Sequence, residues 1–526
     1  MRSRVLAAVA ALFLLPVLLR AEAPASPEAL KQQVERGRRI YVEGSSPSGG
    51  EVTAVMSDAG VEVPASAVPC GGCHGRDGKG RPEGGVSPTD LTWSSLTKPY
   101  GVTHPSGRKH PPYDARLLKR AIAMGLDPAG NKLQDAMPRF RMSLKDMEDL
   151  VAYIRQLGEE KDPGVSEAAL RVGVLLPPSG ALSGMGRAVR SALTARFEQV
   201  NQDGGIYGRR IEPRFLEAPG PPEQRRAWAA DFLEREEVFA GVAGFIAGAD
   251  SELASLFQEK QVPLIGPFTL YPREAFPLNR YVFYLLPGVE AQGQALLRFV
   301  RSQGDAKPRA AVVAPAGAEL DGAVEAVRRA AGAAGWPEPL IVRQERGKEA
   351  ADLQRLTGAK PDPVFFLGSG AEARALLQAA DRAGWRPRFL ATAAAADDSL
   401  LGAPAAFDGK VFVALPTSPQ GPEPQAAATY RALAAAAKLP TDNLSAQLSA
   451  LASADVLIES LRRLGRDISR EKLVDELEKL NKYSSGYIPP VSYGPNRRLG
   501  ARGAYVMRLD LKGRRWVPEG GWIEVE

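Results

Sequence analysis

The sequence predicts two unlike folds in one chain: a small all-α domain followed by a larger, two-lobed α/β region. Its 526 residues exceed what one compact domain commonly holds. Before about residue 160, apolar residues recur at helical spacing on both sides of a loop-rich stretch. From Leu170 onward, short apolar strands alternate with amphipathic helices, the pattern of parallel sheets covered on both faces. We therefore expect a multidomain protein.

The first residues have the composition of a targeting segment. Arg2 and Arg4 give a basic start, residues 5–19 form an apolar run, and residues 21–23 offer a small-residue cleavage site. The run is too short for a comfortable membrane span. We expect residues 1–23 to be a signal peptide that directs the protein to the periplasm, with no transmembrane span after cleavage. An uncleaved membrane tether is the alternative.

Charge and motif content exclude several functions. The net charge of +6 is slight for 526 residues, and no dense Lys/Arg tract with interleaved aromatics exists, so nucleic acid is not an expected partner. Residues 168–526 contain no P-loop, no dinucleotide fingerprint and no set of metal-ligand spacings. No histidine follows His110. The region offers no catalytic constellation, so an enzyme is not the leading expectation.

Two helices are expected to bracket the first domain. Ser26 followed by Pro27 is typical of a helix start, and the helix should run to about Gly44. Ser143 precedes a second apolar stripe at helical spacing, which ends at Leu157.

Between these helices the chain carries Cys-Gly-Gly-Cys-His at residues 70–74, which includes both of its cysteines. Two thiols at this spacing can add to the vinyl groups of a haem, and His74 then lies where a ring nitrogen can ligate the iron. The alternative, a thioredoxin-type dithiol, needs a preceding apolar strand, whereas residues 61–69 contain two prolines. The sequence therefore predicts one covalent haem c held by Cys70, Cys73 and His74.

The iron needs a second axial ligand or an open position. Met137 is the best candidate because it lies in a loop directly before a proline, and Met142 is its nearest competitor. Met147 belongs to the apolar stripe and is more simply core. The other candidates in this stretch are Met124, His104 and His110.

Residues 28–158 resemble a class I cytochrome c domain. The resemblance implies axial ligation by His74 and Met137, and a crossing of the first and last helices through a glycine and aromatic rings. A long insertion between Gly44 and Cys70 departs from the family pattern. The matching segments are residues 37–41, 70–75, 77–80, 137–138 and 151–154, with Gly37, Tyr41 and Tyr153 as the expected crossing residues.

In the α/β region, polar loops follow several expected strands. Ligands of open α/β sheets bind beyond the carboxyl ends of the strands. The loops at 177–180, 248–251 and 266–269 occupy such places, although each alone is most simply an ordinary turn or cap. The expected strands are residues 171–176, 238–246, 262–266, 310–314, 364–368 and 411–415.

Residues 168–515 resemble the type I periplasmic binding proteins of the branched-chain amino-acid-binding (Leu-binding-like) kind. The strongest matches are residues 172–184 and 200–209. The resemblance implies two lobes joined by hinge strands, closing on a small-molecule ligand. In the amino-acid-binding members, hydroxyls and N–H groups hold the ligand carboxylate, and an acidic residue and a tyrosine hold its ammonium. The corresponding candidates here are Ser179, Ser251, Thr269 and Asp398.

The ligand is left open, because the tyrosine of the second lobe is replaced around residues 319–322. A less polar or aromatic compound that contacts Phe268 and Tyr271 is the alternative to an amino acid.

These expectations divide the chain into a signal peptide (1–23), a cytochrome c domain (28–160), a linker (161–167) and a binding-protein domain (168–526). The leading hypothesis is a periplasmic monohaem cytochrome that transfers single electrons between redox partner proteins and is fused to a ligand-binding module. The alternative is the solute-binding component of an ABC-type importer, with a permease as partner and an accessory haem domain. A third hypothesis, an enzyme, requires an open iron.

Overall fold

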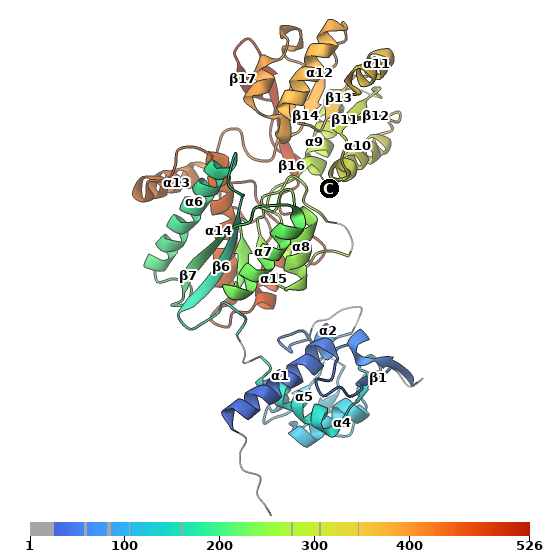
Figure 1. Ribbon diagram of the computed structural model, residues 1–526, viewed down its shortest axis with the longest axis vertical. Helices are drawn as coiled ribbons and strands as arrows, with labels where there is room; N and C mark the ends of the chain where they lie inside the picture. Colours follow the sequence, from blue (N-terminus) through green and yellow to red (C-terminus); the bar gives the residue numbers. More distant parts are fainter. Residues whose placement is uncertain are drawn as a thin grey trace, which may run out of the picture. The chain divides into compact units, whose positions relative to one another are not determined.

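The computed structural model describes residues 26–56, 60–80, 86–104, 106–158, 161–274, 277–304, 307–345 and 347–525. The chain forms two compact units, residues 1–160 and 161–526 (Figure 1), which are described separately below. The predicted signal peptide lies outside the described residues. Within the described ranges, no helix combines the length and apolar character that crossing a bilayer requires.

The first unit is built around two long helices, α1 (Pro27–Glu43) and α5 (Leu144–Gln156). The side chains of Ser26 and Ser143 cap them as predicted, accepting hydrogen bonds from backbone N–H groups. Their apolar faces form the core of this unit. The shorter helices of the unit are η1 (Ala65–Ala67), α2 (Cys70–His74), α3 (Trp93–Leu96) and α4 (Ala115–Met124).

Helices α1 and α5 meet at Gly37. A Cβ atom at this position would lie 1.9 Å from the carbonyl oxygen of Asp149, so only glycine permits the approach. The rings of Tyr41 and Tyr153 pack beside the crossing with their centroids 5.3 Å apart. Arg36 on α1 binds the Asp149 carboxylate at 2.7 Å. The expected crossing through a glycine and aromatic rings is confirmed.

The first unit also contains strands, so the prediction of an all-α domain was wrong in this respect. A hairpin of β1 (Thr53–Met56) and β2 (Val61–Pro64) lies in the insertion and forms a three-stranded antiparallel sheet with β5 (Arg139–Arg141). A second small hairpin joins β3 (Val102–Thr103) to β4 (Lys109–His110). The strands were missed because each is short and pairs with a distant or irregular segment, which local periodicity does not reveal.

The second unit begins with a lobe built on a parallel sheet. Its elements are β6 (Ala169–Leu176), β7 (Arg210–Glu217), β8 (Ala240–Val242), β9 (Leu264–Ile265), β10 (Val282–Phe283), α6 (Ser183–Gln202), α7 (Pro222–Arg235), α8 (Asp250–Glu259), α13 (Pro424–Ala437), α14 (Leu444–Leu464) and α15 (Arg470–Glu478). The strand order is β10-β9-β8-β6-β7. Helices α6, α14 and α15 contribute to the core on one face, and α7 and α8 to the core on the other.

The other lobe carries a larger mixed sheet (Figure 1). Its elements are β11 (Ala311–Pro315), β12 (Leu340–Gln344), β13 (Val364–Phe366), β14 (Phe389–Ala391), β15 (Val411–Leu415), β16 (Gly503–Asp510), β17 (Arg515–Pro518), β18 (Ile523–Glu524), α9 (Val289–Ser302), α10 (Asp321–Ala333), α11 (Glu349–Ala359), α12 (Gly370–Arg382), η2 (Ala318–Leu320), η3 (Ala393–Ala395), η4 (Asp398–Gly402) and η5 (Ala405–Phe407). The order β12-β11-β13-β14-β15 is parallel, and β16 and β17 extend it antiparallel.

The chain passes between the lobes three times: between β10 and α9, between β15 and α13, and before β16. Two of these crossings run side by side, because the N–H of Tyr284 donates to the carbonyl of Arg498 and the N–H of Gly500 donates to that of Tyr284, both at 2.8 Å. The predicted two-lobed α/β fold with hinge segments is therefore confirmed.

The crossing at Gly37 gives a stability prediction. Replacing Gly37 with Ala should lower the free energy of unfolding of the first unit by about 3 kcal/mol, because the new methyl group meets backbone atoms that cannot move independently. Native-state hydrogen exchange of the α1 and α5 peptides, in the full chain, measures this loss. Gly50→Ala is the control, since the nearest atom to its Cβ lies 3.6 Å away. Equal protection in the two variants would contradict the close crossing.

Candidate functional site

The Cys-x-x-Cys-His segment folds as the short helix α2, which begins after Pro69. Cys70 is half-buried and Cys73 is exposed. Burial raises the pKa of the Cys70 thiol to about 12. A protonated, half-buried Cys70 is a poor nucleophile for thiol–disulfide exchange. Residues three apart on a helix point to the same side, which suits attachment of both thiols to one planar group.

His74 ends α2 and is buried, with 6% of its surface exposed. Its Nδ1 lies 2.8 Å from the carbonyl oxygen of Thr89. A carbonyl only accepts, so Nδ1 carries the proton and Nε2 keeps its lone pair. Burial lowers the pKa of His74, which favours the neutral imidazole that a metal requires. A histidine oriented in this way by a backbone carbonyl has the usual arrangement of a metal ligand.

The loop after α2 is fastened to the rest of the first unit. The hydroxyl of Tyr41 on α1 donates to the carbonyl of Gly75 at 2.8 Å. The N–H of Gly80 donates to the carbonyl of His74 at 2.9 Å. Gly78 has a φ of +73° and a Cβ there would lie 2.4 Å from Leu157, so the chain can turn against α5 only with glycine at this position. The donor set and its supports fit a covalently held haem.

The methionine candidates differ in burial. Met137 and Met142 are both half-buried at the edge of the first core, on either side of β5. Met147 is 8% exposed within the core, as expected of a packing residue, whereas Met124 is 64% exposed. Met137 is followed by Pro138, and its N–H donates to the carbonyl of Gln134 in a turn. Burial leaves Met137 and its competitor Met142 as the thioether candidates.

The side chains of His104 and His110 contact each other. Their Nε2 atoms lie 3.0 Å apart, and Nδ1 of His110 lies 2.8 Å from the carbonyl of Pro111. Arg108 donates to Nε2 of His104 at 3.0 Å and to the fully buried Asp127 at 2.7 Å. Burial, followed by the charges of Arg108 and His110, lowers the pKa of His104 to about 4. This cluster stabilises the β3–β4 hairpin.

In the second unit, the four predicted cleft residues all lie in segments that follow strands. Ser179 is exposed after β6, Ser251 is exposed in the first turn of α8, and Asp398 is exposed at the start of η4. The hydroxyl of Thr269 donates to the carboxylate of Asp250. Thr269 is therefore already engaged by a residue of the chain itself.

Asp250 was not predicted from the sequence. Its carboxylate also accepts the N–H of Gly248 at 2.9 Å, and the N–H of Tyr271 donates to Thr269 Oγ1 at 2.8 Å. Burial raises the pKa of Asp250. The signal available in the sequence was an acidic residue in the first turn of the helix that follows β8. Acidic residues are common at helix amino termini, so this signal does not by itself indicate a binding site.

A cavity of about 560 Å³ lies beside these loops, between the two lobes. Among the described residues that line it, none is one of the four predicted cleft residues, but Tyr271 is included. The pKa of Tyr271 is raised by burial and then by the negative charges of Glu319 and Asp250, so this tyrosine lies near acidic groups of both lobes. The cavity lining joins residues 270–274 of the first lobe to Glu290, Glu319 and Gly322 of the second.

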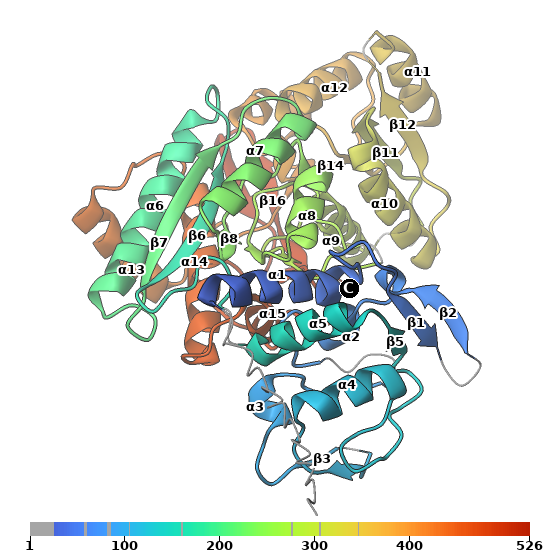
Figure 2. The same ribbon diagram turned by 60° about the horizontal axis from the view of Figure 1, so that its bottom comes forward.

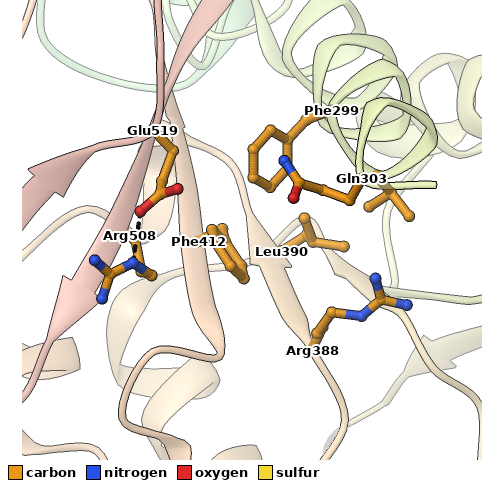
Figure 3. A pocket seen from close by; sticks show the side chains of 8 residues that line it. Phe299, Gln303, Arg388, Leu390, Phe412, Arg508 and Glu519 are labelled. Carbon is orange, nitrogen blue, oxygen red and sulfur yellow. Dashed lines mark hydrogen bonds and ion pairs between the residues drawn. The ribbon is translucent and has the colours of Figure 1, made fainter. Parts of the chain in front are cut away.

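A second, smaller cavity of about 150 Å³ lies within the second lobe (Figure 3). Phe299, Leu390 and Phe412 form its apolar lining. Leu390 is the middle residue of β14, and Phe412 is the second residue of β15. Both arginines that line this cavity form ion pairs: Arg508 binds Glu519 at 2.5 Å, and Arg388 binds Asp362 at 3.0 Å.

Comparison with known families agrees with this division. The family model of periplasmic binding proteins matches residues 169–515, more than half of the chain. The chain belongs to this family. The cytochrome c family model matches residues 63–158 of this binding protein, the segment that contains α2, α5 and Met137. A cytochrome c domain implies a covalently bound haem. A search of curated proteins finds no match.

Solved structures share the fold of the second unit. A fatty acid ABC transporter substrate-binding protein from Thermomonospora curvata has a TM-score of 0.57 at 19% identity, covering 70% of this chain and 95% of its own. A branched-chain amino acid ABC transporter protein from Thermus thermophilus with bound valine has a TM-score of 0.55 at 18% identity, covering 68% and 97%. A type 1 periplasmic binding protein from Bordetella pertussis has a TM-score of 0.56 at 17% identity, covering 67% and 100%.

The lowered pKa of His104 predicts acid sensitivity of the first unit. The unfolded chain takes up a proton near pH 6.5, but folded His104 does so only near pH 4, so stability falls as the pH drops between these values. His104→Gln should remove part of this decline, so its melting curve should depend less on pH. Melting temperatures of the first unit from pH 8 to 4, for both proteins, test this. Parallel pH profiles would contradict the assignment.

Proposed function

We propose that this binding protein is a periplasmic monohaem cytochrome c that transfers single electrons, with Cys70 and Cys73 attaching the haem and His74 and Met137 as its axial ligands. The observation that carries the proposal is the buried His74, whose Nδ1 is turned to the Thr89 carbonyl at 2.8 Å directly after two cysteines one helical turn apart. When bound, the haem supplies a one-electron iron couple.

The chain's own residues support electron transfer in two ways. The hydrogen bond from His74 Nδ1–H to Thr89 fixes the ring and increases the basicity of Nε2, so the ligand needs little rearrangement when the charge of the iron changes. A methionine in the second axial position is soft and neutral, favours the ferrous state and raises the potential. If both His74 and Met137 ligated the iron, small molecules would not reach it, which would favour electron transfer between redox partner proteins over an enzymatic reaction.

A variant pair distinguishes the two methionine candidates. In the full-length holoprotein, the oxidised wild type should show the iron–methionine charge-transfer band, and the reduced wild type should not bind carbon monoxide. Met137→Ala should lose the band and bind carbon monoxide rapidly, because an axial position opens. Met142→Ala, the control on the other side of β5, should behave as the wild type. A wild type that lacks the band or binds carbon monoxide rapidly overturns the proposal and favours the enzyme hypothesis.

We further propose that the second unit binds a small molecule between its lobes, as the solute-binding part of an ABC-type importer would, with a permease as partner. The observation in favour is the interlobe cavity of about 560 Å³, which is within the usual size range of small-ligand sites. Its lining combines the aromatic ring of Tyr271 with three carboxylates and three guanidinium groups, so a ligand would meet an apolar surface and charges of both signs. The charged residues are Glu274, Glu290, Glu319, Arg273, Arg329 and Arg502.

Ligand binding can be tested on the full chain by thermal shift and calorimetry with valine and with a medium-chain fatty acid, the ligand classes named for two structural neighbours. Tyr271→Ala should weaken binding of whichever probe binds by at least about tenfold, which is about 1.4 kcal/mol. Tyr207→Ala is the matched control, because Tyr207 is exposed and outside the cavity lining. Equal affinities in both variants would place the ligand elsewhere.

A further inference from the structure

The insertion between Gly44 and Cys70 had no role assigned from the sequence. The cytochrome c family model begins at residue 63, so residues 45–62 lie outside the matched segment. We call residues 45–56 and 60–64 the clamp. Its hairpin is anchored in the first core, where Ala54 is 0% exposed and Val52 is 6% exposed. The clamp is therefore a packed part of the first unit.

The clamp pairs with β5, the strand that directly follows the loop containing Met137 (Figure 2). This loop, residues 125–138 between α4 and β5, is called the methionine loop below. Strand β1 pairs antiparallel with β5, with Val55 opposite Arg139 and Ala54 opposite Phe140. Phe140 is 3% exposed, so this pair is locked into the core. Because β5 begins two residues after Met137, the backbone next to this methionine cannot move without breaking the strand pairing.

A second set of contacts joins the clamp to the start of α5. The hydroxyls of Ser46 and Ser48 donate to the carboxylate of Asp146, at 2.9 and 3.0 Å. Asp146 is 1% exposed and also accepts the hydroxyl of the helix-capping Ser143 at 2.7 Å. Loss of these donors would leave a buried carboxylate with fewer hydrogen-bond partners, which is costly. These bonds therefore hold the α5 end of the segment that runs from Met137 to α5.

Arg139, the first residue of β5, also contacts the methionine loop directly. Its guanidinium donates to the carbonyl of Met137 and, at 3.4 Å, to that of Leu133. The guanidinium lies against Gly125, the residue that ends α4, where a Cβ would be 1.7 Å from Arg139 Nε. One side chain on β5 therefore fixes the backbone on both sides of the methionine loop.

We propose that the clamp and Arg139 together hold Met137 in place as an axial ligand, so that the insertion controls how firmly the methionine stays on the iron. This inference rests on the proposed function. A flexible loop must lose conformational entropy before its methionine can bind the iron. A loop that strand pairing and charge-assisted hydrogen bonds already hold in one conformation loses less entropy on binding, so the ligand is held more firmly. Arg139 is a positioning residue, because it touches the backbone of Met137 and not the reacting atoms.

An arginine pair provides a matched test. Arg139→Ala should weaken the iron–methionine band of the oxidised holoprotein and make the reduced form bind carbon monoxide at least about tenfold faster, which corresponds to about 1.4 kcal/mol. Arg139→Lys should restore both properties in part. Arg39→Ala is the control, because Arg39 is half-exposed on α1 and pairs with Glu43 of the same helix, away from the clamp and β5. The content of attached haem and the far-ultraviolet spectrum show that each variant is folded.

A second pair tests the clamp itself. The double variant Ser46→Ala/Ser48→Ala removes the donors to Asp146, and should shift carbon monoxide binding in the same direction as Arg139→Ala. Ser45→Ala removes an equivalent hydroxyl that donates to the exposed Glu43 on α1, and should leave the protein unchanged. If the wild type shows the band and all these folded variants keep wild-type band intensity and carbon monoxide reactivity, the clamp has no such role. If the wild type lacks the band, the proposed methionine ligation itself fails.

Discussion

The first unit depends on the close approach of α1 and α5 at Gly37. The absence of a side chain there lets the two backbones touch, since any Cβ would lie 1.9 Å from the Asp149 carbonyl oxygen. The crossing brings Tyr41 under α2, where its hydroxyl holds the Gly75 carbonyl directly after His74. The position of the histidine ring is thus fixed by a helix that begins more than forty residues earlier in the chain. A haem site of this kind needs a rigid frame, and packing of the two terminal helices provides it.

The site in the second unit has a different origin. Parallel strands end at one edge of each sheet, so polar loops from distant sequence positions gather there. At the carboxyl edge of the first-lobe sheet, the carboxylate of Asp250 already accepts hydrogen bonds from the hydroxyl of Thr269 and the N–H of Gly248. A second carboxylate at the same place would meet a like charge. This arrangement disfavours the binding of a ligand carboxylate at Thr269.

The insertion shows how an added segment can act on a site without contributing a residue to it. Strand β1 of the insertion pairs with β5, and Ser46 and Ser48 donate to Asp146. The insertion therefore contacts both ends of the segment 139–146. The contacts are backbone pairing and hydrogen bonds to a buried carboxylate, both of which are costly to break. Electron transfer benefits from a ligand set that does not rearrange, and an ordered methionine loop meets that requirement.

The sequence by itself determined the haem motif, the helix caps at Ser26 and Ser143, the glycine crossing and the two-lobed α/β pattern, because each depends on local spacing or on a strong family pattern. It missed the charged edge strand β7 (Arg210–Glu217) and the β1–β2–β5 sheet, whose partners are far apart in the chain. It named Thr269 but could not show that Asp250 engages it, or that Thr89 accepts from His74. Only the tertiary structure decided these points, because a hydrogen bond between distant segments depends on where the fold brings them and leaves no periodic signal in the sequence.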